Sequence, residues 1–340
     1  MMASSVDVIV PCYNYGRFLR RSVDSILTQA GVRVRVLIID DASNDDTPEI
    51  GRALAREDGR VEFRRHTSNC GHITTYNEGI QWLTADYALL LSADDGLTPG
   101  ALRRATRLMD AHPGVGLTYG QQIAAFDEEW PNVTDVGDRA YRLMSGAAFL
   151  EMTSASGQNA VPTPTAVVRT SLQIAIGGYR KELPHTGDLE VWLRLAARGA
   201  VGVIDAVQAI KRFHGRNMQL DYLQDPLGDL NERLAAFETF FGEHPDLANR
   251  DRLRATLMSR LASEAFWAAS GAFDRHDAAT CDRLLAWARN LDPDCVERPE
   301  WSRLKWKRRC GPLLWSALRP AVNRVRASSI VHNAAPVPSR

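Results

Sequence analysis

Short hydrophobic runs alternate with helix-like segments through the first hundred residues, and this alternation restricts the fold more than any other feature. The predicted strands are 6–11, 34–40, 61–66 and 86–93; the first, second and fourth are rich in β-branched and leucine residues, and the third is "VEFRRH". Between them, apolar residues recur at helical spacing in 15–30, 46–58 and 74–85. Such alternation is typical of α/β proteins, so we predict a mainly parallel, Rossmann-like sheet flanked by helices.

Acidic residues follow two of these predicted strands. Asp40-Asp41 ends the second strand, and Asp94-Asp95 ends the fourth in the stretch "LLLSADDGLTP" (89–99). Ligands of parallel sheets bind beyond the carboxyl ends of the strands. Adjacent carboxylates repel each other and resist burial unless a positive charge lies close by. Their hard oxygen ligands favour Mg²⁺, Mn²⁺ or Ca²⁺ over Zn²⁺.

Other features exclude several classes of protein. Neither GxGxxG nor GxxxxGK[ST] occurs after the first strand, so neither a dinucleotide fold nor a P-loop is supported. Lysine plus arginine equals aspartate plus glutamate, 41 each, so the net charge argues neither for nor against a polyanionic partner; we predict no nucleic-acid partner. Five cysteines without CxxC spacing, no signal-peptide pattern and no long apolar run lead us to expect a cytoplasmic protein without a spanning helix.

Five motifs in order resemble the inverting, nucleotide-sugar-dependent glycosyltransferases of family 2, which have the GT-A fold. They are "VIVPCYNYGRFLRRSVDSILTQ", "LIIDDASNDDT", "NCGHITTYNEGI", "LLLSADDGLTPGAL" and "GGYRKELPHTGDLEVWLRLAARG". Each motif alone is weak, but their order and spacing cover roughly residues 6–220. The resemblance implies a nucleoside-diphosphate sugar donor, expected to be UDP-linked, a divalent Mn²⁺ or Mg²⁺ ion, and a glycan or lipid-linked acceptor.

The resemblance also assigns roles to particular residues. The residues implied for the donor nucleotide are Pro11, Tyr13, Asp40, Asp41 and Asp94. Those implied for the metal are Asp95, Asp94 and His214, the last in "KRFHGRNM" (211–218). Asp188 of "GDLEVW" matches the position of the catalytic base, although many members carry Glu-Asp where this chain has Gly187-Asp188.

The implied chemistry explains these residue types. Departure of the nucleoside diphosphate builds positive charge on the sugar and negative charge on the phosphates, which a divalent ion stabilises. An acceptor hydroxyl needs a general base, which typically contributes about 10²–10⁴-fold. Two structural explanations remain open: Asp188 could instead cap the helix it begins, and Asp40-Asp41 with Ser43 and Asn44 could form only a turn.

The resemblance ends near residue 220. We therefore predict a donor-binding half at 1–120, an acceptor-binding half at 121–220, an all-helical extension at 221–300 and a basic tail at 301–340. The tail contains no acidic residue, and tryptophans are interleaved with its arginines and lysines. It fits either peripheral attachment to an anionic membrane or a solvated helix whose tryptophans pack on the extension, and the extension could form a homodimer.

Two other functions are compatible with the same sequence. A nucleotidyltransferase of related fold would normally carry a glycine- and arginine-rich phosphate loop after the first strand, where this chain has "PCYNYGRFL". A catalytically silent scaffold that binds sugar nucleotides is the other alternative. The carboxylates at Asp94, Asp95 and Asp188 argue for the enzyme, provided that they converge in the fold.

Overall fold

The computed structural model describes residues 3–215, 225–311, 314–315 and 317, and their contacts divide the chain into two compact units, 1–254 and 255–340. The first unit contains a nine-stranded sheet. Its strands are β1 (Ser5–Cys12), β2 (Arg33–Asp40), β3 (Val61–Arg65), β4 (Tyr87–Leu90), β5 (Gly96–Leu97), β6 (Val115–Phe126), β7 (Tyr141–Met144), β8 (Val167–Arg169) and β9 (Ala200–Phe213).

The helices of the first unit follow the strands along the chain. They are α1 (Gly16–Leu27), α2 (Thr47–Glu57), α3 (His72–Trp82), α4 (Ala101–Ala111), α5 (Gly146–Ser156), a 3₁₀ turn at Thr163–Thr165, α6 (Thr170–Ile176), α7 (Gly187–Ala196) and α9 (Pro226–Glu243). α10 (Arg250–Asp274) crosses into the second unit, which also contains α11 (Ala278–Leu291), a 3₁₀ turn at Pro293–Glu297 and α12 (Pro299–Cys310).

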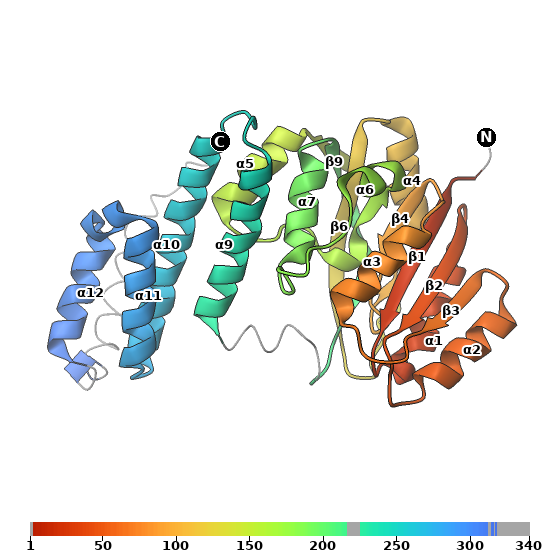
Figure 1. The fold of residues 1–340 in the computed structure, drawn as a ribbon, viewed down its shortest axis with the longest axis horizontal. Helices are drawn as coiled ribbons and strands as arrows, with labels where there is room; N and C mark the ends of the chain where they lie inside the picture. Colours follow the sequence, from red (N-terminus) through yellow and green to blue (C-terminus); the bar gives the residue numbers. More distant parts are fainter. Residues whose placement is uncertain (1–2, 216–224, 312–313, 316, 318–340) are drawn as a thin grey trace, which may run out of the picture. The chain divides into compact units, whose positions relative to one another are not determined.

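The sheet has the order β3-β2-β1-β4-β8-β6-β9-β5, with β7 also paired to β9. β1 to β4 are parallel, as the alternating pattern predicts, and they lie side by side in Figure 1. Beyond β4 the sheet is mixed, because β8 runs antiparallel to both of its neighbours while β6 and β9 are parallel to each other. β1 thus lies between β2 and β4, at the point where the strand order of the sheet reverses. Ligands of such sheets bind beyond the carboxyl ends of the strands at this point.

Side chains on the two faces of β1 explain why this strand is apolar throughout. Val6, Val8 and Val10 join the core beneath α1, α2 and α4. Ile9 points to the opposite face, where its side chain occupies the space beside Gly79 of α3. A strand buried on both faces reads as a continuous hydrophobic run. This packing fixes the rim on which the predicted carboxylates stand.

Candidate active site

Two loops at the carboxyl ends of β1 and β2 are joined by reciprocal hydrogen bonds. The backbone N–H of Asn14 donates to Ser43 Oγ (2.8 Å), and the N–H of Asn44 donates to Asn14 Oδ1 (2.8 Å). Asn14 and Ala42 both have left-handed backbones, with φ of 58° and 61°. Alanine is rarely found in that conformation, so the surrounding contacts must hold the turn next to Asp41 against its strain.

A pocket of about 340 Å³ opens between these loops and α3. It brings together three of the residues predicted for the donor nucleotide, namely Pro11, Tyr13 and Asp41. Asp41 is held firmly, because its carboxylate accepts the backbone N–H groups of Cys70 (2.7 Å) and Gly71 (2.9 Å). Pockets of this size commonly bind small ligands with a few fixed polar groups.

Asp40 lies elsewhere. Its side chain is fully buried, accepts the backbone N–H of Ser43 (2.9 Å) and pairs with Arg65 (3.1 Å). It lines neither this pocket nor the one described below. Its contacts therefore stabilise the turn, whereas its neighbour Asp41 faces the pocket.

His66 completes the environment of Asp41, and the sequence motifs gave no sign of it. Nδ1 of His66 lies 2.7 Å from Asp41, and Nε2 lies 2.8 Å from Glu78 of α3. Burial alone would lower the pKa of His66, but its hydrogen bonds to the two carboxylates outweigh this and raise the pKa above its ordinary value. The imidazole thus favours its charged form between two acidic groups. Asp41, His66 and Cys70 also form a cluster that could hold a metal ion.

The pair Asp94-Asp95 is buried at the end of β4. Asp94 accepts hydrogen bonds from Ser92 Oγ and lies 3.1 Å from His214 Nε2, and Asp95 Oδ1 accepts the backbone N–H of Arg212 (2.9 Å). Burial, reinforced by the charge of Asp94, raises the pKa of Asp95 well above its ordinary value. Two desolvated carboxylates side by side are hard oxygen donors that gain from a divalent cation, so the residues fit such an ion.

His214 follows the end of β9, as its predicted position implies, but it does not line either pocket. Its imidazole is buried against Tyr15 and Phe18, with ring centroids 5.2 and 5.3 Å away. It contacts Asp94 from behind. The structure therefore brings the three predicted metal-site residues together. Asp94 and Asp95 line the pocket, and His214 lies behind Asp94.

Arg212 lies directly behind the aspartate pair. Its Nε donates to the carbonyl of Asp94 (3.1 Å), and its guanidinium is stacked between the rings of Phe18 and Trp130, 4.4 and 5.0 Å from their centroids. The same guanidinium donates to the carbonyl oxygens of Asp127 and Glu129. We name the connection between β6 and β7, residues 127–140, the strap. Arg212 thus joins the strap to the backbone that carries Asp94 and Asp95.

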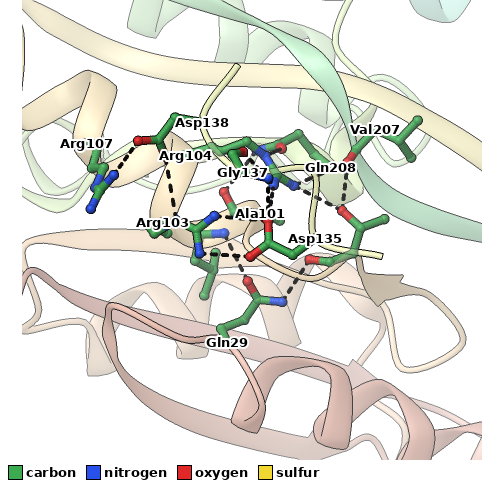
Figure 2. A network of polar contacts seen from close by, with 12 residues as sticks. Gln29, Ala101, Arg103, Arg104, Arg107, Asp135, Gly137, Asp138, Val207 and Gln208 are labelled. Carbon is green, nitrogen blue, oxygen red and sulfur yellow. Dashed lines mark hydrogen bonds and ion pairs between the residues drawn. The ribbon is translucent and has the colours of Figure 1, made fainter. Parts of the chain in front are cut away.

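The second half of the strap is fixed by arginines of α4. Figure 2 shows Arg103 and Arg104 converging on Asp135, with distances of 2.9 and 3.3 Å, while Arg107 pairs with Asp138. Arg104 is almost fully buried and also donates to Gln208 of β9 (2.7 Å). The strap is therefore held at both ends, by Arg212 at the site and by this network on α4.

Asp188 lies in the first turn of α7. Oδ2 accepts hydrogen bonds from Thr163 Oγ1 (2.6 Å) and Asn159 Nδ2 (2.9 Å), and Oδ1 accepts the N–H of Leu189 (2.7 Å). The residue that precedes the helix, Thr186, makes no side-chain cap and instead donates to the carbonyl of Glu232 in α9 (3.0 Å). Asp188 is half-buried and lines a pocket, so one carboxylate is both oriented and accessible.

This second pocket, of about 220 Å³, unites the three acidic residues that matter most for the predicted chemistry: Asp94, Asp95 and Asp188. It adjoins the first pocket, with which it shares the lining residues Tyr15, His72, Tyr76 and Ser92. Burial, followed by the charges of Asp188, Asp94 and Asp95, raises the pKa of Tyr76. The Tyr76 hydroxyl is therefore kept neutral between the carboxylates.

The pocket also contains residues that the sequence analysis did not single out. Lys211 brings a positive charge to the lining of this pocket, and Tyr179 packs edge-on against Tyr76 with centroids 5.2 Å apart. His185, another lining residue, lies 3.1 Å from Asp229 of α9. A helix from the region predicted as an extension thus buttresses the loop before Asp188.

Comparisons with known proteins agree with this geometry. Residues 7–161 match the sequence model of glycosyl transferase family 2. The protein MT1568 of Mycobacterium tuberculosis is 27% identical over 215 residues, which cover 61% of this chain and 66% of that protein. The chain therefore spans just under two thirds of that relative's length.

Two solved structures share the fold. S. aureus TarS 1–349 in complex with UDP-GlcNAc superposes with a TM-score of 0.62 at 15% identity, covering 86% of this chain and 82% of TarS. The mannosyltransferase PcManGT from Pyrobaculum calidifontis, in complex with GDP-Man and Mn²⁺, gives 0.52 at 18% identity, with 86% and 88% covered. The predicted GT-A fold with a C-terminal helical region is thereby confirmed.

Proposed function

Since residues 7–161 of this chain belong to glycosyl transferase family 2, we propose that it is a metal-dependent, inverting enzyme that transfers a sugar from a nucleoside-diphosphate sugar to an acceptor hydroxyl by single displacement. One observation carries the proposal. The pocket that contains Asp94, Asp95 and Asp188 adjoins the pocket that contains Pro11, Tyr13 and Asp41, and the two share four lining residues. A donor can therefore lie across both, with its nucleotide in the first and its sugar in the second.

The nucleotide end of the donor would lie against Tyr13 and Asp41. Asp41 accepts hydrogen bonds from the protein, yet it lines the pocket and can accept another from a base edge. A UDP-linked donor is our first choice, in keeping with the UDP-GlcNAc bound to TarS, while the GDP-Man bound to PcManGT makes guanosine the alternative. Asp94 would approach the ribose or the metal.

Asp94 and Asp95 would hold a divalent ion, Mn²⁺ or Mg²⁺, with His214 orienting Asp94 and serving as the third metal-site residue. When bound, that ion would neutralise the charge that develops on the departing diphosphate. Lys211 adds a fixed positive charge to the same pocket. Arg212 keeps the two aspartates in place through the Asp94 carbonyl and the Asp95 carboxylate.

Asp188 would accept the proton of the attacking acceptor hydroxyl. Its hydrogen bonds from Thr163 and Asn159 hold the carboxylate in one orientation, as a positioned base requires. If the acceptor hydroxyl attacks from the side of α7 while the nucleoside diphosphate leaves toward Asp95, the anomeric centre is inverted. The rings of Tyr76 and Tyr179, which line the same pocket as Asp188 and Asp95, offer a surface for an acceptor sugar.

The acceptor we propose is a glycan or a lipid-linked glycan. Among the described residues, no helix has both the length and the apolar character needed to cross a membrane. Access to a lipid-linked acceptor would then come through peripheral attachment by residues 301–340. Of that segment, residues 312–313, 316 and 318–340 lie outside the described part of the chain. A homodimer through the helical extension also remains a proposal.

The test is release of nucleoside diphosphate from a panel of activated sugars, with and without Mn²⁺ and candidate acceptors. We expect turnover with one donor class, loss of metal-dependent donor binding in Asp95→Ala, and loss of transfer with intact donor binding in Asp188→Asn. Donor binding by Asp95→Ala that still responds to Mn²⁺ would reject the metal site. Full turnover by Asp188→Asn would reject the base, and the anomeric configuration of the product by NMR would decide between inversion and retention.

A further inference from the structure

Helix α12 of the second unit has two faces of different character. Trp301, Leu304 and Lys307 point inward and are buried. The ring of Trp301 lies 5.3 Å from that of Phe266 in α10, and Lys307 Nζ lies 2.6 Å from Asp274. Two of the residues that make the tail basic and aromatic in sequence, Trp301 and Lys307, therefore take part in internal packing.

The outer face of α12 is different because it combines cations with an exposed ring. Arg303, Trp306 and Arg309 follow each other at a spacing of three, which places them in one row along the helix surface, and Lys305 flanks the row. All four are exposed, and the side chain of Trp306 is 53% accessible. We name these four residues the α12 patch.

The cations of the α12 patch differ from their neighbours in having no acidic partner. Within the described residues, none of Arg303, Lys305 and Arg309 forms an ion pair, whereas Arg308 on the edge of the same helix pairs with Asp282 of α11. Their positive charge is therefore available to an external ligand.

Trp306 is presented in a defined orientation. Its ring meets that of the buried Trp315 at 90°, with centroids 6.2 Å apart, and Trp315 is itself fixed by a hydrogen bond from Nε1 to Asp274 (2.7 Å). Leu314, beside Trp315, is 54% exposed. An outward tryptophan and leucine among cations are the residue types that enter the headgroup region of a bilayer.

From this juxtaposition we propose that the α12 patch binds the surface of an anionic lipid bilayer, with Trp306 inserted among the headgroups and Arg303, Lys305 and Arg309 paired with lipid phosphates. Attachment here would bring the transferase to lipid-linked acceptors. This consequence of binding rests on the proposed function, whereas the binding does not. The binding itself needs no donor, metal or turnover.

The experiment is co-sedimentation of the full chain with vesicles made of equal parts phosphatidylglycerol and phosphatidylcholine, and with vesicles of phosphatidylcholine alone. We expect binding to the anionic vesicles only, weakened by salt. Each basic residue contributes roughly 1 kcal/mol at such a surface, so Arg303→Glu/Arg309→Glu should lower the partition coefficient ~30-fold or more. Trp306→Ala should lower it several-fold.

The matched control is Arg52→Glu/Arg56→Glu, an equal charge change at exposed positions of α2, which should bind as the wild type does. Thermal melts show whether each variant is folded. Equal binding by the wild type and Arg303→Glu/Arg309→Glu, or equal binding to both vesicles, would overturn the proposal. So would a dimer in solution that Trp306→Ala converts to a monomer, because the patch would then be covered by a second copy. Vesicle binding by a chain that lacks transferase activity would reject the proposed function alone.

Discussion

Arg212 offers the most direct test of how the site is built. It is almost fully buried, and its guanidinium donates to three carbonyl oxygens, those of Asp94, Asp127 and Glu129, between two aromatic rings. We consider Arg212→Met, which keeps the length and the apolar stem but removes every donor. The three carbonyls then lose this partner inside the protein, and the aspartate pair loses a buried cation.

The magnitude follows from these contacts. Removing one partner from a buried charged network typically costs about 3–5 kcal/mol, because the remaining polar groups stay desolvated. For a unit of this size, 1 kcal/mol corresponds to roughly 2–4 °C, so the melting temperature should fall by about 10 °C. Groups that orient metal ligands typically change affinity ~10–100-fold, and we expect Mn²⁺ binding to weaken by that factor.

Loss of stability alone could mimic this effect, and Arg104→Met is the control. Arg104 is as buried as Arg212 and anchors the far end of the same strap through Asp135 and Gln208, but it contacts neither Asp94 nor Asp95. Thermal melts and Mn²⁺ titration by calorimetry should show both variants destabilised and only Arg212→Met impaired in metal binding. If Arg212→Met melts like Arg104→Met and binds Mn²⁺ like the wild type, Arg212 does not position the aspartates.

Other predictions concern the two carboxylates at the ends of the site. Asp188→Asn should lower kcat by about 10²–10⁴-fold with little change in the donor KM, and Thr163→Val, which removes one hydrogen bond from Asp188, should lower it less. His66→Gln should destabilise the protein most at low pH. The folded-state pKa of His66 is raised, so its contribution is complete below the unfolded-state pKa of ~6.5 and is lost as the pH rises through the higher folded-state pKa. Melting temperatures that differ from the wild type equally at all pH values would contradict the charged bridge between Asp41 and Glu78.

The parallel half of the sheet could be predicted because its signals are local. Each of β1, β2 and β4 contains a compact apolar run, helical patterns separate the four strands, and both faces of β1 are covered. Nothing in the sequence analysis delimits β6, β7 or β8. β6 is a twelve-residue strand whose second half is largely exposed or half-buried and shows no alternation of apolar and polar residues, and β8 is only three residues long. Their pairing depends on distant partners rather than on a local pattern.

The candidate site divides in the same way. Asp41, Asp94 and Asp95 could be placed at the rim because they stand at strand ends, whereas Asp188 is assigned only by the family resemblance. That Asp40 turns inward beside Asp41 follows from the alternation of a strand, whose register the sequence alone leaves open. Residues such as His66, Lys211 and Asp229 reach the site from separate elements, and no spacing within the sequence joins them to it.

Arg212 and the strap also explain a residue inside the aspartate motif. A Cβ atom on Gly96 would lie 2.4 Å from Cη2 and 2.6 Å from Cζ2 of Trp130, the ring that covers the Arg212 guanidinium. Indole is rigid, so Gly96→Ala must push Trp130 away from Arg212. Overpacking of this kind typically costs about 1–3 kcal/mol, and Mn²⁺ binding should weaken with it.

The double variant Gly96→Ala/Trp130→Ala tests this cause. Trp130→Ala alone removes the ring and its contact with Arg212, and each single variant should be destabilised. In a Trp130→Ala protein, a methyl group on residue 96 no longer meets the indole ring. Adding Gly96→Ala to that protein should therefore lower its stability very little. We therefore expect a coupling free energy of at least ~1 kcal/mol from the thermal melts of the four proteins. Additive effects would mean that glycine is required at position 96 for its backbone conformation and not for the approach of Trp130. The ring of Trp130 would then not couple the strap to the loop that carries Asp94 and Asp95.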